Sequence, residues 1–401
     1  MRGFQFYTPT RIVFGPGAEE QAGRQISSLE RSRALVVYGG HSAVKSGLLD
    51  RVLRSLAGEG IVYETFGGVQ PNPRLALARE GIKKALDFRA DLILGVGGGS
   101  VLDTAKAVAI GAADPSVDIW EDLWLKKKPP EKALPVGAVL TIPAAGSECS
   151  DSAVLTRDDT HEKRGLSGDL LRPKFALMNP ELTFTLPKYQ VSCGVVDIMM
   201  HTLDRYFNPA VEDGLANDLT DGLAEALLRC VIKNGREALK RPGDYQAMSE
   251  LMWAGSLSHN GLTGLGGARD FSVHQLGHEL SAMFDVAHGA SLSAVWDSWA
   301  RYCVEQDVPR FARLGVKVWG LNPAGKDDKT LALEAIEATK SYFRDLDMPV
   351  SLPELGIGVL PEEKLEELAR RCTFYGKRKV GAFRVLEYED LLSIYKMANS
   401  K

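Results

Sequence analysis

Hydrophobic residues follow two different patterns in the two halves of the chain. Up to about residue 186, short and nearly continuous runs of Val, Ile and Leu precede glycine-bearing turns and helical patterns, as in "ALVVYGGHSAVKSGLLDRVLRSL" and "DLILGVGGGSVLDTAKAVAIGA". Such runs are typical of parallel strands covered on both faces, and the strand, turn and helix order is typical of βαβ units. We therefore expect an α/β domain with a parallel sheet over residues 1–186, which binds its ligand at the carboxyl ends of the strands.

The second half has helical periodicity with few strand-like runs. Segments such as "PKYQVSCGVVDIMMHTLDRYF" and "DGLAEALLRCVIKNGREAL" are amphipathic at the helical repeat. Prolines 173, 180 and 187 lie in the segment that connects the two patterns, and proline disfavours a continuous helix there. We predict an all-α domain over residues 187–401.

Composition narrows the class of partner. The 401 residues carry a net charge of −4, with 25 % charged and 45 % hydrophobic residues, which is ordinary for a globular protein and shows no cationic excess for nucleic acid or an anionic membrane. The sequence shows no signal-peptide core and no uncharged run of membrane-spanning length, so we expect a cytoplasmic protein. The five cysteines are widely spaced, which favours buried free thiols over disulfides. Small-molecule partners are the expectation.

A glycine turn in "LILGVGGGSVLDTAK" predicts a phosphate site. Residues 97–100 (Gly-Gly-Gly-Ser) follow an apolar strand and open a helix, so backbone N–H groups and the helix dipole can meet a diphosphate. The alternative is a turn that only needs positive φ. The GxGxxG fingerprint is absent, because Asp103 and Lys106 occupy the first turns of the helix. Asp103 fits either an ordinary first-turn carboxylate or a residue near the cofactor.

The turn in "VVYGGHSAVKSG" bears on the choice of cofactor. A carboxylate here would bind the adenosine ribose and repel a 2′-phosphate, and none is present. Gly39 and Gly40 leave space, Ser42 can donate a hydrogen bond, and Lys45 or Lys163 could supply positive charge. This favours NADP(H) over NAD(H), against the alternative of a plain surface turn with solvated lysines.

Two histidine-bearing segments predict a metal site. "DIMMH" places Asp197 and His201 four residues apart, and "HQLGHELSAMFDVAH" contains His274, His278 and His288. Residues four apart share a helix face, so spacing alone favours His274 with His278 and leaves His288 open. One carboxylate with imidazoles suits Fe(II), Zn, Co or Ni, and argues against Mg or Ca. A capping or core histidine is the alternative at each position, and the HExxH pattern of zinc proteases is absent.

Several motifs in order resemble the iron-containing (group III) alcohol dehydrogenases, and within them the butanol dehydrogenase-like branch. They include "YGGHS", "PNP", "GVGGGSVLDTAK", "TIPAAGSE", "NPELTFTLP", "DIMMH" and "HQLGHELSAMFDVAHGA", which together span most of the chain. The resemblance departs at His41, where the branch often has a third glycine, and at Ser150, where Asn is common. Neither departure touches the metal-site segments.

The resemblance implies residue roles that spacing leaves open. It implies a single divalent metal, Fe(II) or Zn(II), held by Asp197, His201, His274 and His288, with His278 as a catalytic proton relay. The alternative for His278 is a histidine that only orients a ligand. The implied cofactor contacts, with the nicotinamide facing the metal, are Gly39, Gly40, Ser42, Asn72, Gly97, Gly98, Gly99, Ser100, Asp103, Thr141, Ser147, Lys163 and Leu182.

The implied reaction is reversible reduction of short- to medium-chain aldehydes to primary alcohols by NAD(P)H. A related alternative is a lyase of the dehydroquinate synthase kind, whose phosphate-bearing substrate would need a basic pocket that the metal-site segments do not offer. A non-haem Fe(II) oxygenase would not need the glycine turn, and a non-catalytic NADP-binding sensor would not need the metal ligands.

The family also implies a homodimer, in which the β-rich segment "FQFYTPTRIVFG" pairs across the interface. An edge strand that pairs only within one chain is equally consistent with that segment.

Overall fold

Two compact units make up the part of the chain that a computed structural model describes, residues 2–208 and 216–400. The sheet unit comprises Tyr7–Leu186 and Gly243–Asn260. The helical unit comprises residues 2–6, the described residues of Pro187–Pro242, and residues 261–400. The predicted fold class, a parallel α/β sheet domain followed by an all-α region, is confirmed.

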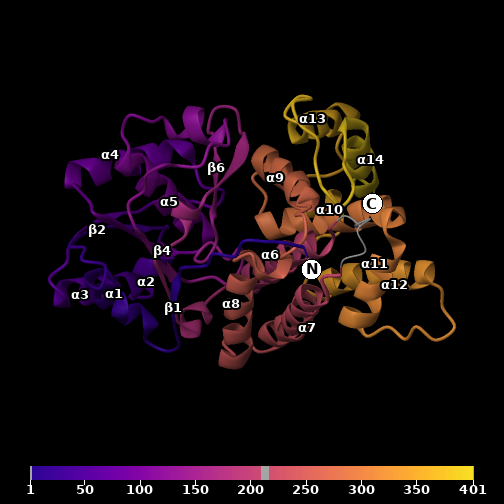
Figure 1. Cartoon of the computed structure of the whole chain (residues 1–401), viewed down its shortest axis with the longest axis horizontal. Coiled ribbons are helices and arrows are strands. Elements are labelled where there is room, and N and C mark those ends of the chain that lie inside the picture. Colours follow the sequence, from indigo (N-terminus) through magenta and orange to yellow (C-terminus); the bar gives the residue numbers. More distant parts are fainter. Residues whose placement is uncertain (1, 209–215, 401) are drawn as a thin grey trace. The chain divides into compact units, whose positions relative to one another are not determined.

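The sheet unit is built around six parallel strands in the order β1-β8-β5-β4-β2-β3 (Figure 1). The strands are β1 (Arg11–Phe14), β2 (Arg33–Tyr38), β3 (Val62–Phe66), β4 (Leu92–Gly97), β5 (Val136–Leu140) and β8 (Phe175–Met178). Every residue of the central strands β4 and β5 is buried, which explains their continuous apolar runs. A separate antiparallel hairpin joins β6 (Ser152–Thr156) to β7 (Lys163–Ser167).

Helices cover both faces of this sheet. The covering helices are α1 (Ala22–Ser27), α2 (Ser42–Lys45), α3 (Leu48–Gly58), α4 (Leu75–Phe88) and α5 (Gly99–Ala113). Val36 and Leu94 pack with Val52 of α3 in one core, whereas Leu35 packs with Val108 of α5 in the other. Alternate strand residues therefore serve opposite faces, and the glycine turns fall at the carboxyl ends of β2 and β4.

Helix α8 (Tyr245–His259) packs with the sheet unit, although the predicted division at residues 186/187 assigned it to the helical domain. Its Met252 joins an apolar cluster with residues of β5 and β8. Ser256 donates to Glu148 Oε1 at 2.5 Å, and His259 Nδ1 lies 2.6 Å from the carbonyl oxygen of Ala145. These contacts join segments far apart in the sequence, which periodicity cannot reveal.

The helical unit contains α6 (Lys188–Tyr206), α7 (Asp218–Lys240), α9 (Ser272–Phe284), α10 (His288–Cys303), α11 (Val308–Leu314), α12 (Asp328–Asp345), α13 (Glu362–Cys372) and α14 (Tyr388–Ala398) (Figure 1). Helix α6 is buried along nearly its whole length, as expected for a helix that is not strongly amphipathic. Large aromatic side chains fill the core around it, including Phe207, Trp296, Trp299 and Phe311. Their fixed packing gives the polar side chains of α6 a rigid support.

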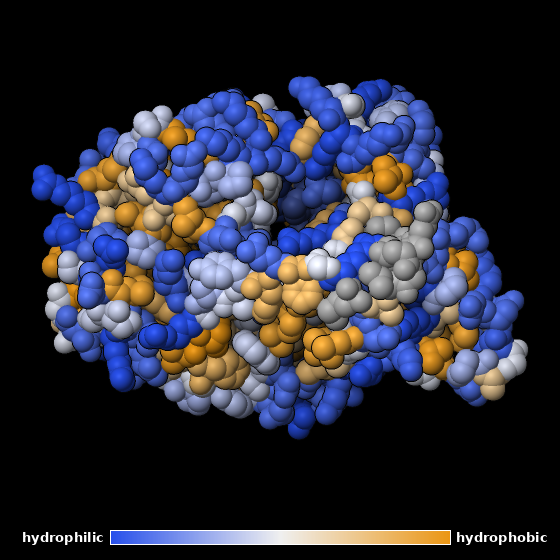
Figure 2. Space-filling model, in the orientation of Figure 1, coloured by the Kyte–Doolittle hydropathy of each residue, from blue (hydrophilic) through white to orange (hydrophobic). Residues whose placement is uncertain are grey.

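The face of the molecule drawn in Figure 2 is mostly hydrophilic, with separate hydrophobic areas. Among the described residues, no helix combines the length and the apolar character needed to cross a membrane.

Candidate metal centre and nucleotide-binding turn

Helix α6 presents three buried polar side chains on one face. Asp197, His201 and Asp204 are spaced four and three residues apart, which places them on successive turns of the same side. None of the three is more than 4 % exposed. A hydrophobic helix with one polar stripe facing inward is a typical source of metal ligands in helical domains.

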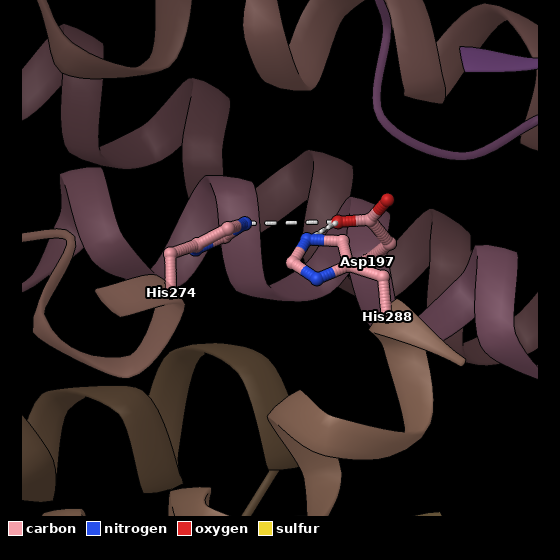
Figure 3. Close-up of side chains that lie close together, drawn as sticks. All are labelled: Asp197, His274 and His288. Carbon is pink, nitrogen blue, oxygen red and sulfur yellow. Dashed lines mark ion pairs between the residues drawn. The ribbon is translucent and has the colours of Figure 1, made fainter. Parts of the chain in front are cut away.

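Helices α9 and α10 bring two more histidines to this stripe. His274 lies in the first turn of α9, and His288 is the first residue of α10. The ligand atoms of Asp197, His274 and His288 all lie within 4.8 Å of one another (Figure 3). Asp197 Oδ1 lies 3.6 Å from His274 Nε2, 3.7 Å from His288 Nε2 and 3.3 Å from His201 Nε2.

Three separations agree with a tetrahedral metal ion, whereas His201 lies outside the group of three whose ligand atoms are within 4.8 Å of one another. Ligand bonds of about 2.0–2.2 Å give edges of about 3.3–3.6 Å between ligand atoms, close to the three separations around Asp197 Oδ1. Asp197 Oδ1 and His274 Nε2 are buried and have no hydrogen-bond partner among the described residues. Unpartnered buried polar atoms that converge on one point in this way are compatible with a shared cation.

The surroundings of His274 favour positive charge. Burial alone would lower the pKa of His274, but the two carboxylates that face its nitrogens, Asp197 and Asp204, outweigh burial and raise it. His274 Nδ1 lies 2.5 Å from Asp204 Oδ2. Asp204 was not singled out from the sequence, although its position seven residues after Asp197 on the same helix face was a usable signal.

His278 lies beside the metal cluster without belonging to the group of three. It is one turn after His274 on α9 and is buried, and its ring centroid lies 5.2 Å from that of His288 and 6.2 Å from that of His274. The structure thus groups His288, and not His278, with Asp197 and His274. The ligand and relay roles stay predictions.

Close packing of α6 against α10 fixes the place of His288. A Cβ atom added at Gly289, the next residue, would lie 2.2 Å from the carbonyl oxygen of Cys193 on α6. Cys193 is one turn before Asp197, so only glycine at position 289 lets the two helices approach near the ligands.

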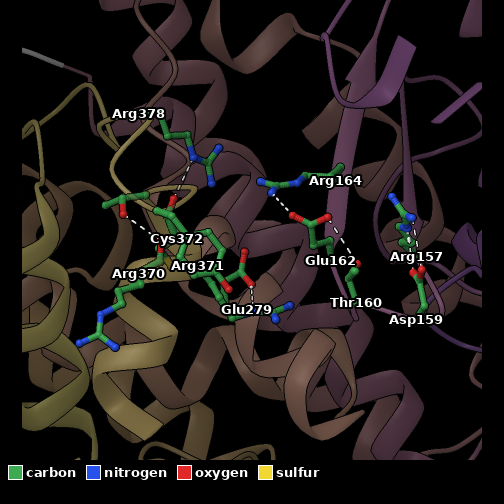
Figure 4. Close-up of polar contacts among 12 residues, drawn as sticks. Arg157, Asp159, Thr160, Glu162, Arg164, Glu279, Arg370, Arg371, Cys372 and Arg378 are labelled. Atoms are coloured by element: carbon green, nitrogen blue, oxygen red, sulfur yellow. Dashed lines mark hydrogen bonds and ion pairs between the residues drawn. The ribbon is translucent and has the colours of Figure 1, made fainter. Parts of the chain in front are cut away.

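Two arginines from the C-terminal region contact α9 or the end of α13 near it. Arg371 of α13 pairs with Glu279 at 2.9 Å between Nε and Oε2, and Arg378 donates to the carbonyl oxygen of Cys372 (Figure 4) and to Gln275. From the sequence we expected no basic cluster here, because the segments next to the ligands contain none. The Glu279 carboxylate balances the charge of Arg371, so this pair is not a preformed phosphate site.

The predicted nucleotide-binding turn lies between β4 and α5. None of Gly97, Gly98 and Gly99 has a positive φ, so a left-handed turn does not explain them. A Cβ at Gly97 would lie 2.5 Å from Val101, whereas one at Gly99 would meet only Ala145, at an ordinary 3.7 Å. The fold therefore tolerates a side chain at position 99, so internal packing does not explain the glycine there.

Asp103 and Lys106 anchor α5 to the segment after β5. Ser147 Oγ and the Val154 amide donate to the two oxygens of Asp103, at 2.7 and 2.9 Å. Burial raises the pKa of Asp103, although Lys106 and these hydrogen bonds oppose the shift. Lys106 is fully buried and donates to Ser150 and to the carbonyl oxygen of Ser152, and burial lowers its pKa to about 8. The side chains of Asp103 and Lys106 thus help to fix the position of the glycine turn at the start of α5.

The other predicted cofactor residues lie in the same unit. Gly39 and Gly40 follow β2, and the exposed Ser42 begins α2. Lys163 is buried and donates to Asn72 Oδ1 at 2.9 Å, and Asn72 has a φ of 58°. Two further residues lie close to the carboxyl ends of strands: Thr141, which follows β5, and Leu182 in the short helix Pro180–Thr183 after β8. Contacts with a dinucleotide stay predictions for this whole set.

Comparisons with known proteins identify the family of this chain. The models described as iron-containing alcohol dehydrogenase and as the C-terminal domain of that family match residues 9–180 and 191–399. NADH-dependent butanol dehydrogenase A of Clostridium acetobutylicum is 39 % identical, with 99 % of both chains covered. The NADPH-dependent aldehyde reductase YqhD of Escherichia coli is 34 % identical, with 99 % of this chain and all of the relative covered.

Solved structures give the same result. A crystal structure of NADH-dependent butanol dehydrogenase A from Thermotoga maritima superposes with a TM-score of 0.92 at 36 % identity, covering 99 % of each chain. Matches to both family models and to full-length relatives above 30 % identity confirm the resemblance seen in the sequence. The chain belongs to the iron-containing alcohol dehydrogenase family, and it is an NAD(P)-dependent oxidoreductase.

Proposed function

We propose that the protein interconverts short- to medium-chain primary alcohols and aldehydes, using NAD(P)H and one divalent metal, Fe(II) or Zn(II). The observation that carries this proposal is the convergence of three imidazoles on one buried carboxylate oxygen, Asp197 Oδ1. The names of the relatives, butanol dehydrogenase and aldehyde reductase, support the same reaction class.

In this proposal, separate residues bind the metal and transfer the proton. Asp197, His201, His274 and His288 would hold the metal, which supplies Lewis-acid stabilisation of negative charge on the substrate oxygen, while the nicotinamide supplies the hydride. His278, next to His274 and His288, would donate a proton to that oxygen during reduction and accept one during oxidation. Reduction thus consumes one aldehyde, one NAD(P)H and one proton, and yields one alcohol and NAD(P)⁺.

For the cofactor, the proposal favours NADP(H) over NAD(H). No carboxylate follows β2, where one would repel a 2′-phosphate, and the exposed Lys45 on α2 lies close in sequence to that turn. Lys163, the other lysine considered, is buried against Asn72, so Lys45 is the stronger candidate for binding the phosphate. Relatives named for NADH and for NADPH both occur at similar identity.

A dehydroquinate synthase-like lyase and a non-catalytic sensor are less well supported. The ion pair between Arg371 and Glu279 leaves no uncompensated arginine charge in this pair for a phosphate-bearing substrate. A sensor would have no use for three imidazoles placed within 3.7 Å of one buried carboxylate oxygen.

The proposal predicts metal-dependent reduction of butyraldehyde. Purified protein is assayed with NADPH and with NADH, before and after chelation and with Fe(II) or Zn(II) added back, while metal content is measured by elemental analysis. We expect chelation to abolish turnover, add-back to restore it, and kcat/KM to be higher with NADPH. Turnover that survives complete metal removal would refute the metal role, and a preference for NADH would refute only the cofactor assignment. Metal and cofactor binding without turnover would favour the sensor.

We also propose a homodimer that forms through the N-terminal segment. Strand β1 is an edge strand that pairs only with β8 within the described chain, and Phe4, Phe6, Tyr7 and Phe14 are each at least 41 % exposed. An exposed edge with aromatic side chains is a template for pairing with a second copy. Sedimentation analysis should give twice the mass of one chain, and the double substitution Phe4→Ser with Phe6→Ser should shift it toward the monomer. A monomeric wild-type protein would contradict this assembly.

A further inference from the structure

We propose that Asp204 is a positioning residue of the metal centre, because its carboxylate holds the His274 ring with Nε2 directed at the shared ligand cluster. This inference rests on the proposed function, in which His274 binds the metal. It concerns a residue outside the four proposed ligands and outside the cofactor set, and it assigns a role to the third member of the polar stripe on α6.

Both nitrogens of the His274 ring face carboxylates from the same helix. Nδ1 lies 2.5 Å from Asp204 Oδ2, and Nε2 lies 3.6 Å from Asp197 Oδ1. Asp204 and His274 are 1 % and 3 % exposed, so water does not compete for this contact. Because Asp197 and Asp204 are two helical turns apart on α6, the ring spans a fixed length between them and cannot rotate without losing one contact.

The hydrogen bond also selects the tautomer of His274. An ionised carboxylate only accepts hydrogen bonds, so the proton lies on Nδ1 and the lone pair of the neutral ring lies on Nε2. The neutral ring binds a metal through this lone pair on Nε2. An anionic partner on Nδ1 increases the basicity of Nε2. Asp204 therefore acts on the metal through the ring, without touching the metal itself.

A purely structural histidine would look different. A buried histidine in a folded core usually satisfies both nitrogens, whereas His274 Nε2 has no hydrogen-bond partner in the described parts of the chain. Moreover, the two carboxylates beside the ring, Asp197 and Asp204, are both buried, and buried negative charges are costly unless a cation is close. A metal on Nε2 resolves both problems at once.

The start of α9 is fixed in a way that supports this geometry. The Asp270 amide donates to the carbonyl oxygen of Asp204 at 2.9 Å. The Asp270 carboxylate accepts from the amides of Ser272, Ala382 and Phe383 at 3.0, 2.8 and 2.8 Å. Between Asp270 and α9, Phe271 has a φ of 54°, a conformation that bulky residues rarely adopt. Hydrogen bonds thus connect the backbone just before His274 to α6 and to the C-terminal region. The position of the His274 ring is therefore fixed by its backbone as well as by the contact with Asp204.

Two substitutions separate charge from contact at position 204. Asp204→Asn keeps the shape and an amide oxygen that can accept from Nδ1, but it removes the charge, whereas Asp204→Ala removes both. Glu225→Gln is the matched control, because Glu225 is also a buried carboxylate of the helical unit, and it binds Tyr206 and Arg313 instead of a histidine. Dissociation constants for Zn²⁺ are measured on metal-depleted protein by competition with a chromophoric chelator, and folding is checked by circular dichroism.

We expect Asp204→Asn to weaken Zn²⁺ binding by about 10- to 100-fold, the range found when such partners of metal-bound histidines are removed. Asp204→Ala should weaken binding at least as much, and Glu225→Gln should leave it unchanged. Affinities within twofold of wild type for both folded Asp204 variants would overturn the proposal. An equal loss in the Glu225 variant would also overturn it, because the effect would then reflect general destabilisation.

A second measurement needs no variant at position 204. In wild-type protein labelled with ¹⁵N-histidine and loaded with Zn²⁺, nitrogen NMR should show a protonated Nδ1 on His274, with its resonance assigned by its absence from His274→Gln. An unprotonated Nδ1 would overturn the proposal even if both Asp204 variants failed to fold. Wild-type protein that binds no Zn²⁺ at these ligands would refute the proposed function itself, and the inference with it. Tight wild-type binding that Asp204 does not affect would refute the inference alone.

Discussion

Replacing His288 by alanine is expected to remove most of the bound metal and to lower kcat/KM for aldehyde reduction by on the order of a thousandfold, because the site loses one of its proposed ligands. The side chain of His288 is 24 % exposed at the first position of α10, so its loss leaves little buried cavity. The metal-free variant should therefore unfold at nearly the temperature of metal-free wild type. Metal content, kcat/KM and thermal unfolding of the two proteins check this expectation.

His278→Ala is the matched comparison, because His278 lies beside the same ligands without belonging to the group of three. It should keep the metal and lose turnover by about 10²- to 10⁴-fold if the imidazole transfers the proton. The opposite result, with metal lost from His278→Ala and kept in His288→Ala, would show that the (i, i+4) pair on α9 binds the metal, and the ligand assignment would be wrong.

Replacing Gly99 by aspartate is expected to weaken dinucleotide binding strongly without harming the fold. Gly99 is the first residue of α5, where a carboxylate stabilises the helix by about 0.3–1 kcal/mol, and a Cβ there meets no atom closer than 3.7 Å. The same carboxylate would repel a diphosphate bound at this helix end and weaken NADPH binding by about two orders of magnitude. The thermal unfolding temperature of the ligand-free protein should thus rise, while the affinity for NADPH falls. Thermal unfolding and fluorescence titration measure the two quantities.

Three further variants complete this experiment. Gly99→Asn is nearly the same size as the aspartate variant but uncharged, so the difference between the two isolates charge. Gly99→Ala isolates the added Cβ alone. Gly58→Ala, at the end of α3 where a Cβ would meet nothing within 4 Å, controls for the loss of a glycine in the same unit. Unchanged NADPH affinity in Gly99→Asp would mean that the phosphates bind elsewhere.

Local patterns were enough to predict the features that depend on short stretches of sequence. The apolar runs of β4 and β5 are buried on both faces, and the glycine turn after β4 opens α5 as expected. Asp197 and His201 share one face of α6 because their spacing follows the helical repeat. The choice between His278 and His288 could not be made this way, because the path of the chain after α9 decides which ring reaches Asp197, and only the family resemblance favoured His288.

Features that depend on contacts between distant segments were missed for a physical reason. Asp204 and His274 meet although 70 positions separate them, and Arg371 reaches Glu279 from 92 positions away. No periodicity links such pairs, since their meeting depends on how whole helices pack. Lys163 illustrates the same limit, because a lysine that composition suggests is solvated turns out to be buried against Asn72.

The assignment of α8 to the sheet unit has a consequence for chimeric enzymes built from relatives of this family. Because the chain leaves the sheet unit at residue 186, returns for residues 243–260 and leaves again, a single crossover at residue 186 would combine a sheet from one parent with α8 from the other. Met252, Ser256 and His259 would then face a foreign surface in place of their partners around β5 and residues 145–148. Exchange of cofactor specificity between parents is therefore best designed with residues 7–186 and 243–260 transferred together.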